Sequence, residues 1–151
     1  MFSYHGLPER QVDKVYEGTD LCEDQPCELE VNEKNKFCYK ATSYATTRLI
    51  AKELGLTEKD YTVCFQSRLD KKWLTPFSDK VVEEWAEKGA KKLLVFSPAF
   101  VADCLETLIE IGDEYQEIFE EKGGEKVQLV PSSNTHPAFV EGLTQLIREQ
   151  L

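Results

Sequence analysis

The feature of this sequence that most constrains its fold is a regular alternation of short apolar strand patterns with longer helical patterns. Strands are predicted at residues 2–5, 62–66, 92–96 and 126–130, and helices at residues 39–54, 78–88, 99–122 and 137–151. Glycines directly follow three of the helical patterns, as is typical where helices stop. Strands separated by helices of this length favour right-handed crossovers, which give a parallel sheet covered on both faces. We therefore predict an α/β fold, Rossmann-like in architecture, with a four-stranded parallel sheet and helices on both faces.

The length and charge of the chain exclude several classes of protein. With 151 residues, 41% of them hydrophobic, residues 1–151 are expected to form a single domain. The net charge of -10 argues against nucleic acid or an anionic membrane as the main partner, because both would be repelled. No apolar run is long enough to span a bilayer, so we expect a cytoplasmic protein whose membrane contact is at most peripheral. No strand is followed by Gly-x-Gly-x-x-Gly, which disfavours NAD or FAD binding.

Polar side chains follow the predicted strands at the edge where parallel strands end. His5 closes the first strand, Ser67 and Arg68 follow the second, and an acidic helix follows the third. In open α/β sheets, ligands bind in the crevice outside the carboxyl ends of the strands. The sequence therefore predicts a site at this rim. The alternatives to a role in ligand binding are a hydrogen-bonded capping role for His5 and an ion pair between Arg68 and a nearby acid.

Three carboxylates recur every fourth residue on the predicted acidic helix. Glu106, Glu110 and Glu114 would stack on one face over about 12 Å, at 1.5 Å per residue. Like charges at this spacing destabilise an isolated helix. The row of carboxylates is therefore explained by exposure to solvent, by a bound cation or by a functional role. A solvated acidic face is the simpler interpretation, and a row of oxygen ligands for a divalent metal or for protons is the alternative.

Four motifs, in order along nearly the whole chain, carry a family resemblance. They are residues 2–8 (FSYHGLP), 65–68 (FQSR), 73–76 (WLTP) and 98–111 (PAFVADCLETLIEI), followed by Asn134, Pro137 and Phe139. Together they resemble the carboxyl-terminal half of ferrochelatase, a class II chelatase that inserts ferrous iron into a porphyrin. Because the four motifs are collinear, the resemblance is specific.

The resemblance implies a lyase of haem biosynthesis, with protoporphyrin IX and Fe2+ as substrates and no required cofactor. His5 matches the active-site histidine of the family, and Glu106 matches the carboxylate that faces it across the porphyrin. The chemistry is removal of two pyrrole N–H protons and entry of the metal. An imidazole that titrates near neutrality can accept a proton or ligate the metal, and a carboxylate can do the same. His5 and Glu106 are therefore the expected catalytic residues.

The resemblance also extends the site beyond these two residues. Glu110 and Glu114 match an acidic row of the family that is discussed as a route for metal or protons. The expected metal ligands are accordingly His5, Glu106, Glu110 and Glu114. The residues expected to line the porphyrin cleft are Ser67, Arg68 and Trp73. For Trp73, packing of the indole on the sheet is the default alternative.

The chain departs from the family pattern in two ways. Cys104 stands where many members carry histidine, although it resembles the form in some Gram-negative enzymes, so the resemblance does not carry an auxiliary ligand role over to this position. Ferrochelatases also have two similar domains, and this chain has one. We therefore expect an expressed carboxyl-terminal domain whose partner, the amino-terminal domain, would supply the opposite wall of the cleft. Alone, such a fragment is expected to have little or no activity.

Residues 17–37 interrupt the regular pattern with a long polar insertion. Cys22 and Cys27 lie in this insertion and Cys38 follows it, so the segment offers three thiolate ligands where a closed metal site normally has four. Some ferrochelatases carry an iron-sulfur cluster, but its usual cysteines lie near the carboxyl terminus, and here that end has none. We favour reduced, unligated thiols, then a metal or cluster site, and last a Cys22–Cys27 disulfide, which the cytosol disfavours.

Two other functions fit parts of the sequence. One is a related chelatase acting on a cobalt or nickel tetrapyrrole, which the ferrochelatase-like segments 66–68 and 105–107 disfavour. The other is a non-catalytic tetrapyrrole- or metal-binding module, which would lack turnover because half the cleft is absent.

Overall fold

The computed structural model describes residues 1–151 and contains four short strands, each of four residues. They are β1 (Phe2–His5), β2 (Val63–Gln66), β3 (Lys92–Val95) and β4 (Lys126–Leu129). They form two parallel pairs, β1 with β2 and β3 with β4. The fold is thus α/β with parallel strands, as predicted.

The predicted four-stranded sheet is not formed as one continuous ladder. A single parallel bridge, between Phe2 and Phe96, joins the two pairs. Its hydrogen bonds run from Ser3 N to the Phe96 carbonyl oxygen, at 2.9 Å, and from Phe96 N to the Met1 carbonyl oxygen, at 3.0 Å. Phe96 lies just past the end of β3, so only the first residues of β1 reach it. The two pairs are therefore edge neighbours with one bridge between them.

The helices lie near their predicted places, with one exception. Their bounds are α1 (Glu9–Val12), α2 (Tyr39–Glu53), α3 (Ser78–Glu87), the π-helix η3 (Glu106–Glu114), α4 (Tyr115–Glu121) and α5 (Pro137–Arg148). Three-residue 3-10 turns, η1 (Asp13–Val15) and η2 (Cys22–Asp24), flank the start of the polar insertion. The short helix α1 begins directly after Pro8, a residue type that is common at helix starts.

The exception is the predicted helix 99–122, which begins about seven residues later and starts as a π-helix. Its first part is instead a loop held by Asp103, whose carboxylate accepts hydrogen bonds from Ser132 N, at 3.0 Å, and from Asn134 Nδ2, at 2.8 Å. Asn134 Oδ1 in turn accepts from Asp103 N at 3.0 Å. These contacts with the loop after β4 replace the hydrogen bonds that an α-helix would make here.

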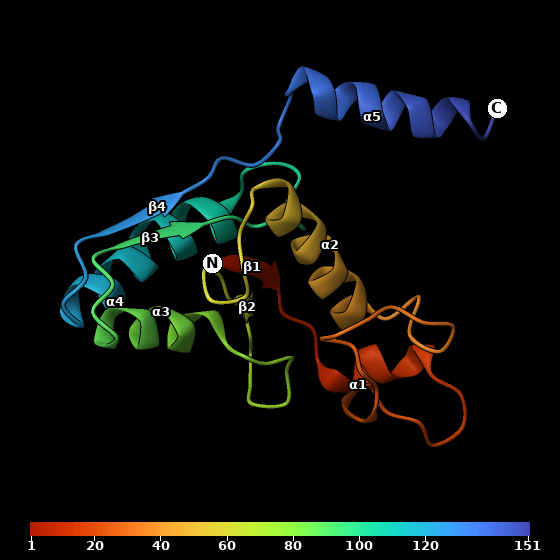
Figure 1. Ribbon diagram of the computed structural model, residues 1–151, viewed down its shortest axis with the longest axis horizontal. Helices are drawn as coiled ribbons and strands as arrows, with labels where there is room; N and C mark the ends of the chain where they lie inside the picture. The colour runs from red at the N-terminus through yellow and green to blue at the C-terminus, as the bar shows by residue number, and fades with distance from the viewer.

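Alternation along β1 and β2 divides the apolar core into two clusters. Met1 and Cys64 point to one side and pack with side chains of α3, η3 and α4, including Phe119. Tyr4 and Phe65 point to the other side and pack with α1, α2 and the cysteines of the insertion. Figure 1 shows α3 and α4 side by side near β3 and β4, with α2 on the other flank of β1 and β2. The strands are thus covered from two sides.

Helix α5 stands apart from both clusters. Figure 1 shows it projecting from the body beyond the loop after β4, and none of its residues is buried. Its large apolar side chains, among them Leu143, Leu146 and Ile147, are exposed. No helix of the chain combines the length and apolarity needed to cross a bilayer.

Candidate active site

His5 ends β1 with one ring nitrogen already engaged. Its Nδ1 lies 2.6 Å from the carbonyl oxygen of Gly6. A carbonyl oxygen only accepts, so Nδ1 carries the hydrogen, and whenever the ring is neutral the Nε2 lone pair is free for a proton or a metal. The ring is half-buried between Trp73 and Phe100, with centroids 6.4 Å and 5.9 Å away. The hydroxyl of Tyr39 donates to the His5 carbonyl oxygen at 2.9 Å, so both side chain and backbone are held.

Glu106 is the first residue of η3, and a buried glutamine anchors its backbone. Gln66, at the end of β2, is 1% exposed, and its Nε2 donates to the Glu106 carbonyl oxygen at 2.7 Å. Hydrogen bonding with the Cys104 thiol lowers the pKa of the Glu106 carboxyl, as do its own backbone N–H and the charge of His5. His5 pairs in register with Gln66, whose side chain holds the Glu106 backbone, so both residues lie at the same edge of the strands. Glu106 is therefore an ionised carboxylate at the edge that carries the imidazole.

Gln66 itself connects three elements at this edge, and sequence reasoning gave it no role of its own. Its Oε1 accepts from Ser3 Oγ at 2.8 Å and from Ser97 Oγ at 3.3 Å. Ser3 lies on β1 and Ser97 follows β3, so one amide side chain ties both strands to η3. A polar residue in an otherwise apolar strand was the available signal, because buried polar groups need such partners.

Glu110 has all its acceptor positions occupied. Its Oε1 accepts from Ser67 N at 2.8 Å and from the Tyr115 hydroxyl at 3.0 Å. Its Oε2 accepts from Ser67 Oγ at 2.6 Å and from Gln66 Nε2 at 3.3 Å. Burial, followed by the charge of Glu110, raises the pKa of Tyr115, so this hydroxyl stays protonated and donates. Glu110 thus holds the turn after β2, where Ser67 adopts a positive φ of 60°.

Glu114 lies at the end of η3 and is exposed, without a partner in the chain. The three carboxylates therefore differ in their surroundings, although they are evenly spaced in sequence. No three ligand atoms from His5, Glu106, Glu110 and Glu114 lie within 4.8 Å of one another. Their role as a metal set remains a prediction.

Arg68 is held by an ion pair at the end of β2. Its guanidinium binds both carboxylate oxygens of Asp79, with Nη2 2.9 Å from Oδ2, and it stacks 4.1 Å from the centroid of the Phe77 ring. Burial alone would raise the pKa of Asp79, but the hydrogen bonds and charge of Arg68 outweigh it and lower that pKa. Arg68 therefore fastens the residue 67–79 segment to the start of α3.

Trp73 lies beside the active-site edge and also lines a cleft next to it. Its ring carbon Cε3 would be 3.2 Å from a Cβ placed on Gly6, so the indole packs closely against the turn after His5. The cleft has a volume of about 780 Å3 and runs past Pro8, Trp73 and Cys22, whereas His5 and Glu106 do not line it. This cleft is thus distinct from the edge that carries His5 and Glu106.

The three cysteines of the insertion come together in the core. Cys22, Cys27 and Cys38 are at most 5% exposed, and their sulfur atoms lie 3.5 to 3.8 Å apart, too far for a disulfide. Hydrogen bonding from Cys22 lowers the pKa of Cys38 to about 5, assisted by the Tyr16 hydroxyl and the backbone N–H of Ala41. All five cysteines are free thiols in the structure.

Comparison with known proteins places the chain in a family. The family model described as "Ferrochelatase" matches residues 1–151. The chain belongs to the ferrochelatase family. It is 43% identical over 152 residues to the ferrochelatase of Coxiella burnetii (strain Dugway 5J108-111) and 44% identical over 152 residues to that of Legionella pneumophila (strain Corby). These matches cover 100% of the chain but only 43% and 45% of the two ferrochelatases, so the chain spans less than half the length of these relatives.

Proposed function

We propose that this chain is the catalytic carboxyl-terminal half of a two-domain, cytoplasmic enzyme that inserts Fe2+ into protoporphyrin IX in haem biosynthesis. The observation that carries the proposal is the placement of His5 and Glu106 at the same edge of the strands. His5 presents a free Nε2 because Nδ1 is committed to Gly6, and Glu106 is an ionised carboxylate whose backbone is held by Gln66, the register partner of His5. Membership of the ferrochelatase family supports the reaction class.

The proposed reaction exchanges one Fe2+ for two pyrrole protons, so two acceptors are needed beside the macrocycle. The Nε2 lone pair of His5 is one acceptor or the first metal ligand. The Glu106 carboxylate is the other acceptor, or an oxygen ligand for incoming iron. Trp73 and Phe100 flank the imidazole with apolar surface suited to a porphyrin face. Ser67 and Arg68 would form part of the same wall.

We further propose that Glu114 and Glu110 serve as a route for iron or protons towards Glu106. Glu114 is exposed and free to bind a cation. Glu110 could contact a cation only by giving up one of its four hydrogen bonds. Of the two, Glu114 is accordingly the side chain whose loss should weaken iron capture.

The remainder of the longer protein is proposed to supply the opposite wall of the porphyrin site. This part of the proposal is supported by the length of the relatives, which is more than twice that of the chain. A porphyrin bound by one wall would gain contact area without being distorted towards the transition state, and such uniform binding does not raise kcat. We therefore expect little insertion activity from the chain alone.

The test uses the complete protein and measures iron insertion from the loss of porphyrin fluorescence. His5→Ala and Glu106→Gln should each lower kcat by about 10²–10⁴-fold while porphyrin affinity changes little. Glu117→Gln, which removes an exposed charge on the neighbouring α4, is the matched control and should leave the rate within about twofold. Unchanged kcat in both His5→Ala and Glu106→Gln would refute the assignment.

A metal comparison in the same assay separates the alternatives. Preference for Fe2+ over Co2+ and Ni2+ is expected. A complete protein that binds porphyrin but turns over none of the three ions would instead be a binding module.

A further inference from the structure

The three cysteines around the polar insertion form a compact ligand set. They are the only group in the chain with three or more candidate ligand atoms within 4.8 Å of one another. The sulfur separations are 3.5 Å for Cys22 and Cys38, 3.7 Å for Cys27 and Cys38, and 3.8 Å for Cys22 and Cys27. Four ligands placed tetrahedrally around one ion, at a zinc–sulfur distance of about 2.3 Å, lie about 3.8 Å from each other. The triangle therefore has the dimensions of three corners of a single-ion site.

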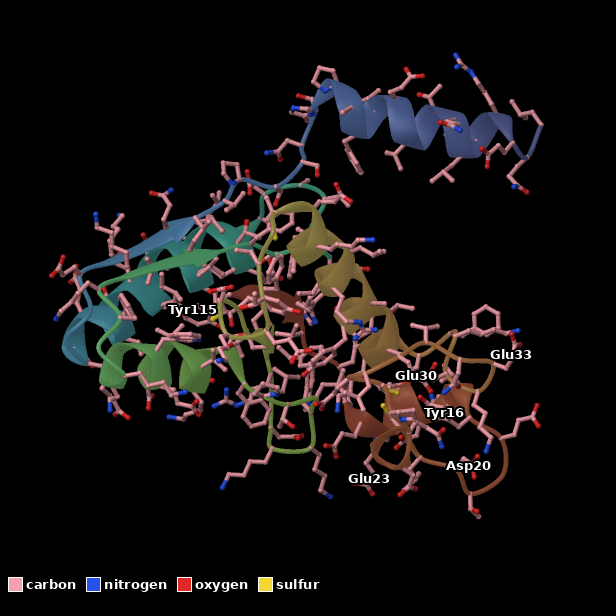
Figure 2. All side chains as sticks on the ribbon, in the orientation of Figure 1. Tyr16, Asp20, Glu23, Glu30, Glu33 and Tyr115 are labelled. Carbon is pink, nitrogen blue, oxygen red and sulfur yellow. The ribbon has the colours of Figure 1, made fainter.

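A hydroxyl and an amide also contact the sulfur atoms. The Tyr16 hydroxyl lies 3.1 Å from Cys27 Sγ, which makes it, or a water molecule beside it, the candidate for the fourth corner. Buried Asn35 directs its Nδ2 at Cys27 Sγ from 3.8 Å and donates to the Glu30 carbonyl oxygen at 3.0 Å. Figure 2 shows sulfur atoms grouped beside the labelled Tyr16. Contacts of this kind orient the ligands of protein metal sites.

The surrounding backbone holds the three cysteines without help from a sheet. Cys22 N donates to Asp13 Oδ1 at 2.9 Å, and Cys38 N donates to the Asn35 carbonyl oxygen at 2.8 Å. Cys38 also precedes the first residue of α2, a 15-residue helix whose amino-terminal end stabilises a thiolate. The site is thus built by several local contacts and is not a chance approach of mobile side chains.

The charge of the segment favours a cation. Residues 17–37 contain seven acidic and two basic residues, a net charge of -5. Asp20, Glu23, Glu30 and Glu33 lie around the cysteine segment in Figure 2. Such a local field raises the concentration of divalent cations near the thiols.

We propose that Cys22, Cys27 and Cys38 bind one thiophilic divalent ion of the Zn2+ class, with Tyr16 or water as the fourth ligand. Each thiol releases its proton on binding. A [2Fe–2S] cluster fits less well, because it requires four thiolates divided between two irons, and sulfurs on different irons lie farther apart than ligands of one ion. This site is separate from the proposed iron-insertion site and does not rest on it.

The ion would secure the end of α2 that supports the active-site histidine. Cys38 is followed by Tyr39, whose hydroxyl donates to the His5 carbonyl oxygen at 2.9 Å. Fixing Cys38 to Cys22 and Cys27 therefore also fixes the position from which Tyr39 holds the end of β1. The role assigned to the ion is structural.

The test titrates the reduced, metal-free chain with Co2+, which replaces Zn2+ and gives thiolate-to-metal charge-transfer absorption. One equivalent should saturate the band, and Zn2+ should displace it. Cys22→Ser, Cys27→Ser and Cys38→Ser should each weaken binding by more than about tenfold, because loss of even an outer partner can cost that much. Cys104→Ser, outside the cluster, is the matched control and should keep the band.

Two further measurements keep the proposal open to refutation if a variant folds poorly. Zn2+ should raise the melting temperature of the unaltered chain and of Cys104→Ser, but not that of the variant in which all three cysteines are Ser. The double variant His5→Ala/Glu106→Gln should keep full Co2+ binding. A band that needs His5 and Glu106 but not the three cysteines, or a chain purified with two irons and acid-labile sulfide, would overturn the proposal.

Discussion

The four hydrogen bonds of Glu110 allow us to predict how much free energy of unfolding is lost when this side chain is removed. In Glu110→Ala, four donors lose their acceptor. Gln66 Nε2 keeps the Glu106 carbonyl oxygen, and the Ser67 hydroxyl can rotate, so the main cost falls on Ser67 N–H and the buried Tyr115 hydroxyl. Hydrogen bonds to a charged group contribute about 1.5–3 kcal/mol each, so for these two we expect a loss of about 3–6 kcal/mol.

Urea unfolding followed by circular dichroism measures this loss. For a chain of this length, about 3 kcal/mol corresponds to a fall of about 6–12 °C in melting temperature. Glu110→Gln keeps the shape but not the charge and should lose roughly half as much. Glu114→Ala removes an exposed carboxylate from the same helix and should change stability by less than about 0.5 kcal/mol. Equal effects of Glu110→Ala and Glu114→Ala would show that Glu110 is not an anchor.

Three other substitutions or deletions test the structure. Gly6→Ala would place its Cβ 2.8 Å from the Gln66 carbonyl oxygen, so urea unfolding should show a loss of about 1–3 kcal/mol. Asp79→Asn should cost about 1–2 kcal/mol of stability at pH 7. Because Arg68 lowers the pKa of Asp79, this stabilisation is present above pH about 4 and is lost as the pH falls through the folded-state pKa. The difference in stability between Asp79→Asn and the unaltered chain should therefore shrink in acid. Deleting residues 137–151 should leave the melting temperature within about 2 °C, since none of α5 is buried, and a larger fall would mean that α5 packs on the body.

Local patterns in the sequence located most of the elements. Each predicted strand agrees with the structure to within one residue, because short apolar runs bounded by turn residues are typical of buried strands. The helices α2 and α3 also begin where predicted, at Tyr39 and Ser78. The late start of the acidic helix could not be predicted, because Asp103 is held by residues about 30 positions away.

The candidate site was predictable in position but not in its contacts. Parallel topology brought His5 and the start of the acidic helix to one edge, as strand order requires. The separate surroundings of Glu106 and Glu110 depend on the π-helical winding and on the positive φ of Ser67, which no spacing rule indicates. The meeting of three cysteines depends on an irregular loop, and the sequence favoured unligated thiols there.

The π-helix also limits which changes of length the chain tolerates at this point. A π-helix closes its hydrogen bonds from residue i to i+5, so η3 holds an extra residue compared with an α-helix. Removing a single residue between Glu106 and Tyr115 would allow α-helical winding, in which each residue turns the helix by about 100°, more than in the wider π-helix. With α4 fixed in the core by Tyr115 and Phe119, the tighter winding would make up for the lost residue and leave Glu106 facing the same way. An inserted residue has no such compensation, because it would rotate Glu106 by about 100° relative to α4 and turn its carboxylate away from His5.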